Sequence, residues 1–123
     1  MKENLKKLML EYNLQYGLIF DFEKNATVTI GETSNIPSNA LITTWLENIQ
    51  KSKNVYDNYS EGTVILPTIM AQDNVRLIIH IPKENILTGF LTNSWTFQDV
   101  LTSRKRLGEE LDKLFAEAEY SPV

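Results

Sequence analysis

The stretch VRLIIHIPKENILTGFLT, residues 75–92, holds two apolar runs separated by a short polar segment. Apolar residues that recur with a period of two are typical of β-strands, and a Pro-Lys-Glu-Asn segment is typical of a turn. We therefore expect strands over 75–81 and 86–92, joined by a turn at 82–85. This pair decides the fold class, because it fixes an antiparallel sheet in the second half of the chain.

Three further segments upstream have the composition of strands. Residues 15–23 and 26–30 alternate in hydrophobicity around the polar turn 23–25, which predicts a hairpin. Residues 63–70 are apolar and β-branched but contain Pro67, which cannot donate a ladder hydrogen bond. This predicts an edge strand or a bulge there. We expect residues 71–74 to form the turn that follows.

Three segments have the period of amphipathic helices: 3–13, 38–53 and the stretch that begins after Thr96. Thr96 is a good N-cap, and Asp99 follows it at the spacing of a capping box. Gly108 interrupts the last helix. The three predicted apolar stripes are Leu5, Leu8, Met9 and Tyr12; Leu41, Ile42, Trp45, Leu46 and Ile49; and Phe97, Val100, Leu101, Leu107, Leu111, Leu114, Phe115 and Ala118.

Together these elements predict an α+β fold with a single antiparallel five-stranded sheet flanked by helices. The predicted order is α-β-β-α-β-β-β-α. We expect one domain over residues 1–123, with an ordered fold over 3–117 and a frayed tail over 118–123. If the first and last helices cover one face of the sheet, the middle helix must cover the other face or contact a partner.

Composition excludes several classes of function. The 123 residues include no cysteine and one histidine, which argues against disulfide scaffolds, thiolate metal sites and catalytic triads. Sixteen acidic against twelve basic residues give a net charge of −4, which argues against a nucleic-acid partner. The apolar runs are too short to cross a membrane. We expect a cytoplasmic protein without a cofactor or metal.

Few residues are candidates for catalysis or for binding a cation or an acidic partner. His80 lies in a predicted strand, where a lone histidine is more often a solvated or hydrogen-bonded residue than a catalytic base. Asp21 and Glu23 could hold a cation, although they are ordinary residues for a turn. The basic run 104–106 could bind an acidic partner, but a solvated helix face is the simpler interpretation. No nucleotide-binding or metalloprotease motif is present, and we expect no enzyme activity.

The runs Tyr16–Asp21, 75–81 and 86–91, followed by the terminal amphipathic helix, are similar to those of the roadblock-type dynein light chain family. That family shares its general shape with longin and profilin-like domains, and the resemblance covers roughly residues 3–117. It implies a non-catalytic, dimeric subunit that pairs its central helices and joins its sheets. It further implies a platform for small Ras-like GTPases or a motor.

Our first functional hypothesis is a dimeric scaffold or regulatory subunit that binds another protein. Its candidate contact residues are Ile42, Trp45 and Ile49 on the wide middle stripe, together with Trp95 beside the last helix, for which an anchoring role in packing is the simpler interpretation. An alternative is a small-molecule sensor whose pocket is lined by Phe20, Phe90 and Leu77. Another is an acidic immunity- or chaperone-type protein that neutralises one partner; such chaperones place three strands before the middle helix.

Overall fold

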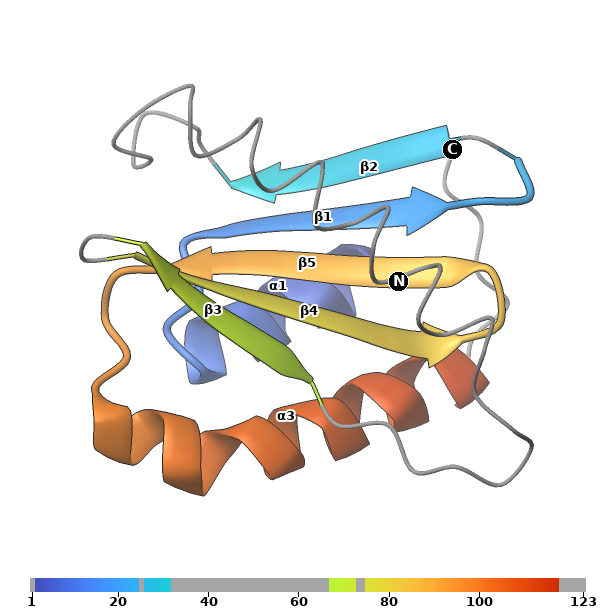
Figure 1. Cartoon of the computed structure of the whole chain (residues 1–123). Coiled ribbons are helices and arrows are strands. Elements are labelled where there is room, and N and C mark those ends of the chain that lie inside the picture. The colour runs from blue at the N-terminus through green and yellow to red at the C-terminus, as the bar shows by residue number, and fades with distance from the viewer. Residues whose placement is uncertain (1, 25, 32–66, 73–74, 118–123) are drawn as a thin grey trace.

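The computed structural model describes residues 2–24, 26–31, 67–72 and 75–117 (Figure 1). Two helices and five strands lie within these residues, and their labels follow the figure. In chain order they are α1 (Lys2–Glu11), β1 (Tyr16–Asp21), β2 (Ala26–Gly31), β3 (Thr68–Gln72), β4 (Val75–Lys83), β5 (Ile86–Thr92) and α3 (Phe97–Glu117).

All five strands form one antiparallel sheet in the order β2-β1-β5-β4-β3. The pairing of β1 with β5 joins the two halves of the chain at the centre of the sheet, with Leu18 opposite Gly89. The edges are β2 and β3. The predicted α+β class with an antiparallel sheet and helices is confirmed. The predicted helix over 38–53 lies outside the described residues, so the middle of the predicted order stays a prediction.

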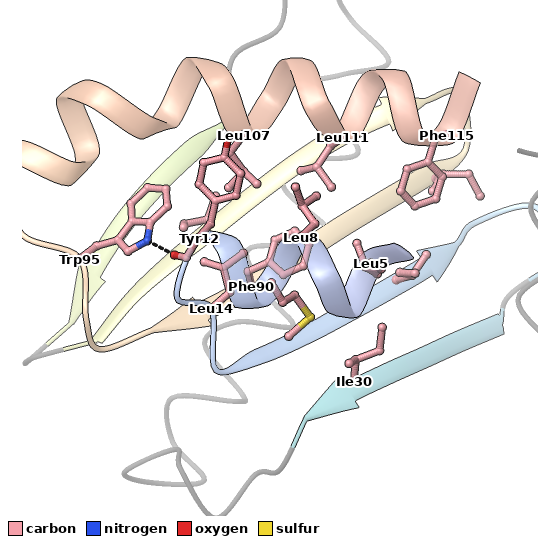
Figure 2. Packing of buried hydrophobic residues seen from close by; sticks show 14 residues of the cluster. Leu5, Leu8, Tyr12, Leu14, Ile30, Phe90, Trp95, Leu107, Leu111 and Phe115 are labelled. Carbon is pink, nitrogen blue, oxygen red and sulfur yellow. Dashed lines mark hydrogen bonds between the residues drawn. The ribbon is translucent and has the colours of Figure 1, made fainter. Parts of the chain in front are cut away.

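Both described helices pack on the same face of the sheet, and the main core cluster is buried between the helices and that face (Figures 1 and 2). Within this cluster, Ile78 and Phe90 of the paired strands β4 and β5 are fully buried beneath the helices. The members of this cluster are Leu5, Leu8, Met9, Tyr12, Leu14, Ile19, Ile30, Ile78, Ile86, Phe90, Trp95, Leu107, Leu111 and Phe115.

The opposite face of the sheet carries a second buried cluster to which neither α1 nor α3 contributes a residue. Its members are Tyr16, Leu18, Val75, Leu77, Ile79, Ile81, Leu87 and Leu91. The central strands are therefore apolar on both faces, which explains why residues 75–92 form nearly continuous apolar runs rather than a clean alternation. That this face is covered by the predicted middle helix stays a prediction, since that helix lies outside the described residues.

Local sequence signals account for several of the element boundaries. Asp21 closes the β1 turn through its Oδ1 atom, which accepts hydrogen bonds of 3.0 Å from the backbone amides of Glu23 and Lys24. Asn85 has a φ of 66° in the β4–β5 turn, a left-handed conformation that asparagine tolerates. Gly31 ends β2 with a φ of 96°, and a Cβ there would collide with the carbonyl oxygen of Gln15. Glycine is required at that position.

Three predictions about element boundaries and burial were wrong. Residues 71 and 72 belong to β3 rather than to a turn. Strand β4 continues through Pro82 to Lys83, because a shift of register between His80 and Lys83 removes the need for a ladder hydrogen bond from the proline. The predicted core stripe of the last helix included Phe97 and Leu101, but both are exposed. The prediction that this segment forms an edge strand is confirmed for the described sheet, in which β3 is the last strand, but Pro67 precedes β3 instead of lying within it.

Candidate partner-binding surface

The most exposed apolar side chains mark the candidate surface. Among the described residues, Leu10 is 81% exposed, Phe97 69% and Leu101 62%. Phe97 and Leu101 are four residues apart on α3, so they lie on one face of the helix and form a pair that we call the α3 patch. Leu10 lies on the other helix, α1. Scattered exposed leucines are ordinary, whereas adjacent large apolar residues indicate an interaction site.

The sequence pattern alone did not reveal this patch, since both residues fit the apolar stripe of α3. Whether a residue of that stripe is buried depends on whether another helix or strand packs against its turn of α3. Leu107, Leu111 and Phe115 pack against the sheet and α1 and are fully buried. Phe97 and Leu101, in the first two turns of α3, are exposed instead.

Trp95 belongs to the core of the monomer. Its indole is 8% exposed, and Nε1 donates a 2.6 Å hydrogen bond to the carbonyl oxygen of Tyr12, as the dashed line in Figure 2 shows. Arg76 of β4 donates from Nε to the carbonyl oxygen of Trp95 at 3.0 Å. These bonds fix the start of α3 to the end of α1 and to the sheet. The prediction that Trp95 also contacts a partner stays a prediction.

His80 joins β4 to α3. The residue is 2% exposed, and its Nε2 atom lies 2.7 Å from Oδ1 of Asp112, whose side chain is about half exposed. The Nδ1 atom is buried and has no hydrogen-bond partner. A carboxylate can only accept, so Nε2 carries the proton in the neutral ring. His80 is therefore a buried, hydrogen-bonded residue that a substrate in solution does not reach.

The acidic and basic candidates also have structural roles. Asp21 is buried and uses Oδ1 to close its turn, and the described residues contain no group of three metal-ligating side chains. In the basic run, Arg104 donates from Nε to the carbonyl oxygen of Pro67, which leaves Lys105 and Arg106 as its exposed members. The structure thus does not bring these acidic and basic candidates together into one site.

The predicted sensor pocket is wrong in its residues. Phe90 lies in the cluster beneath the helices, whereas Leu77 and Phe20 lie with the cluster on the opposite face of the sheet. These three side chains cannot line one cavity: Phe20 is paired with Leu87 and Leu77 with Leu91, and on β5 Leu87 and Leu91 point to the face opposite that of Phe90.

A surface groove lies instead between α1 and α3. Its volume is about 430 Å³, and it is mixed in character: leucines form its apolar part, and lysines and glutamates from both helices surround them. The residues that line it are Asn4, Lys7, Leu8, Glu11, Glu110, Lys113 and Leu114.

Tyr12 lies in the same seam between the two helices. Its hydroxyl oxygen is buried and has no hydrogen-bond partner. Burial raises the pKa of Tyr12, the nearby carboxylate of Glu110 raises it further, and the charge of Arg106 opposes this effect. The side chain thus stays neutral and contributes mainly through its ring.

The remaining candidate contact residues, Ile42, Trp45 and Ile49, lie outside the described residues. In the part of the chain that the structure describes, no helix is both long enough and apolar enough to cross a membrane.

Comparison with known proteins then identifies the fold. No protein-family model and no curated protein sequence matches this chain. Solved structures do match. MglB of Myxococcus xanthus is 16% identical with a TM-score of 0.58, and the match covers 91% of each chain. A structure of MglB with a tetrameric arrangement is 17% identical with a TM-score of 0.59, covering 95% of this chain and 88% of that one.

The gliding protein MglB of Thermus thermophilus is 18% identical with a TM-score of 0.59, and the match covers 94% of this chain and 88% of that one. MglB has the roadblock/longin fold, so the expected roadblock-type fold is confirmed. At these identities the similarity establishes the fold and not the function.

Proposed function

We propose that this chain is a non-catalytic, homodimeric scaffold or regulatory subunit that binds another protein. The observation that carries the proposal is the similarity to MglB structures over more than nine-tenths of the chain. Two features of the described residues support it. The sheet has open edges at β2 and β3, and the α3 patch exposes two large apolar side chains.

The proposal places no catalysis in this chain. The only histidine is buried and bonded to Asp112, and Asp21 accepts hydrogen bonds from backbone amides of its turn. Both side chains therefore have structural roles. General acid–base chemistry requires a titrating group within hydrogen-bond reach of a substrate, and neither of these residues offers one.

The proposed partner is a small Ras-like GTPase or another component of a motor or signalling complex in the cytoplasm. This choice follows from the resemblance of the strands and terminal helix to the roadblock-type family. We propose that the dimer and partner contacts include Ile42, Trp45 and Ile49 of the wide middle stripe. A net charge of −4 favours protein partners with basic surfaces over nucleic acids.

Two measurements test the proposal. Sedimentation velocity at tens of micromolar should give the mass of a dimer or of a higher even-numbered oligomer, with an interface that buries more than about 1,000 Å². Isothermal titration calorimetry with purified small Ras-like GTPases from the source genome, loaded with GDP or with a GTP analogue, should show binding that depends on the nucleotide. A strictly monomeric chain that binds neither form would refute the proposed function.

A further inference from the structure

The groove between α1 and α3 is lined by residues that are separate from the α3 patch. It has a volume of about 430 Å³, and both helices contribute to its walls. Figure 2 shows Tyr12 close to Leu107, and Leu5 lies towards Phe115. Residue numbers therefore fall along α1 as they rise along α3, so the two helices that form the groove are antiparallel.

This antiparallel arrangement places like charges opposite each other across the groove. Glu11 and Glu110 line its end near Tyr12, and both carboxylates raise the pKa of that tyrosine. Lys7 and Lys113 line the groove about one turn farther along each helix. Within the described residues, none of these four charged groups forms an ion pair. The groove thus has an acidic end and a basic end, and neither end is neutralised by a described side chain.

Two leucines supply apolar surface between the charged groups. Leu8 is 7% exposed and belongs to the core cluster, and Leu114 is partly buried against the same cluster. Both line the groove. A complementary partner therefore needs an apolar side chain for the leucines, a positive charge for the glutamate end and a negative charge for the lysine end.

We infer that this groove binds an amphipathic helix of another protein, whose basic residue faces the glutamate pair and whose acidic residue, one turn away, faces the lysine pair. The inference is independent of the homodimer proposed above. Lys7 and Glu11 are four residues apart, which is about 6 Å along the helix axis. Residues at i and i+4 of a second helix have the same separation. Because helices pack at about 8–10 Å, a third helix can contact both walls of the groove.

A helix fits this groove better than a small molecule or an extended peptide does. Small-molecule sites are lined mainly by apolar side chains and enclose most of the ligand, whereas this surface groove has only two leucines among charged and polar side chains. An extended peptide gains affinity through main-chain hydrogen bonds to a sheet edge, but backbone groups inside a helical wall are already bonded. A helix satisfies its own backbone and binds through one face of side chains.

The first experiment selects partner helices for the whole chain. The probe is a yeast-display library of peptides of about 18 residues, built from alanine, leucine, lysine, arginine, glutamine and glutamate so that they form helices. Enriched peptides should carry a basic and an acidic residue one turn apart beside a leucine. In fluorescence anisotropy, a matched peptide whose charged pair has a single sign should bind at least about tenfold more weakly.

The second experiment exchanges charges on α3. The groove exchange, Glu110→Lys with Lys113→Glu, removes the like-charge pattern at both ends and leaves the net charge unchanged. The control exchange, Lys105→Glu with Glu109→Lys, changes the same residue types at exposed positions of the same helix that do not line the groove. The selected helix should bind the groove exchange at least about tenfold more weakly than the wild type, and it should bind the control exchange as tightly as the wild type.

Three outcomes would overturn the inference. The first is a library that yields no binder, or a selected helix that binds the groove exchange as tightly as the wild type. The second is a set of selected peptides that bind without a helical signal in circular dichroism, which would assign the groove to an extended segment. The third is a changed mass of the protein alone in the groove exchange but not in the control, by sedimentation velocity, which would assign the groove to a second copy of the chain.

The proposed function and this inference can fail separately. A monomeric wild type that binds the selected helix refutes the homodimer and supports the inference. A dimeric wild type that binds no helix leaves the proposed function intact and refutes the inference. If the groove exchange fails to fold by circular dichroism, the equivalent exchange on α1, Lys7→Glu with Glu11→Lys, takes its place with the same expected loss of binding.

Discussion

At the residue scale, Tyr12 shows how an aromatic side chain can stabilise a core while its polar atom does not. The ring packs between α1 and α3, and the hydroxyl is buried without a hydrogen bond. Burying an unsatisfied hydroxyl costs about 1–3 kcal/mol. We therefore expect Tyr12→Phe to raise the free energy of unfolding by about 1 kcal/mol in urea denaturation at pH 7. A loss of stability would instead show that the hydroxyl has a partner.

The raised pKa of Tyr12 also predicts the sign of a pH effect. The unfolded side chain ionises near its ordinary value of 10.0, and the folded one ionises at higher pH. The folded state thus binds more protons between these values, so stability is fully present below pH 10 and falls as the pH rises above it. The Tyr12→Phe variant should lose less stability than the wild type between pH 9 and pH 11. Equal losses would contradict the prediction.

The pair of His80 and Asp112 is the second residue-scale case. Removal of the acceptor by Asp112→Ala leaves a buried ring with neither nitrogen bonded, since Nδ1 already has no partner. The expected cost in the free energy of unfolding is about 1–3 kcal/mol. Asp112→Asn keeps an acceptor oxygen and should retain more of the stability, and Lys113→Ala on the neighbouring exposed position should be close to neutral. Equal stability of Asp112→Ala and the wild type would show that the bond contributes nothing.

At the scale of elements, the start of α3 depends on a reciprocal cap. The amide of Asp99 donates to Oγ1 of Thr96 at 3.2 Å, and Oδ2 of Asp99 accepts from the amide of Thr96 at 2.7 Å. Loss of an N-cap side chain costs about 1 kcal/mol. We expect Thr96→Ala to lower the free energy of unfolding by that amount, with Thr102→Ala on the exposed helix surface as the control. A similar decrease in the free energy of unfolding in both variants would show that the cap contributes no more to stability than an exposed residue of the helix surface.

The cap also shows which elements could be predicted from the sequence. Local signals act within a few residues, so Thr96 and Asp99 fix the start of α3, and a nearly continuous apolar run after the predicted turn at 82–85 fixes β5 at its predicted bounds. The continuation of β4 through Pro82 was missed, because it depends on a register shift against β5. The extension of β3 to Gln72 was missed because it depends on pairing with β4. Pairing between distant segments is not encoded in local composition.

Predictions about the candidate surface failed for the same reason. The period of α3 correctly placed Leu107, Leu111 and Phe115 in the core, but it could not distinguish the covered turns from the uncovered turn that holds the α3 patch. Likewise, the burial of His80 follows from the packing of α3 on β4, and no residue near it in the sequence indicates this. Helical spacing specifies a face, whereas the neighbouring elements decide whether that face is buried.

At the scale of the whole molecule, the sheet has two buried faces, but both described helices lie on one of them. The second face holds apolar side chains from β1, β4 and β5, and such a surface is stable only when it is covered. The wide predicted stripe of Ile42, Trp45 and Ile49 is a candidate to cover this face and to contact a second copy. The two roles make different predictions, because a residue used only for the fold does not respond to dissociation of a dimer.

Tryptophan emission distinguishes these roles, because the chain has two tryptophans. In Trp95→Phe, Trp45 is the only one left, and we expect its emission maximum to shift to longer wavelength as dilution dissociates the dimer and water reaches the ring. In Trp45→Phe, the remaining Trp95 is buried inside the monomer, so its emission should stay constant over the same dilution. Sedimentation of the same samples reports dissociation. An unchanged Trp45 emission across a measured dissociation would place Trp45 outside the dimer contact.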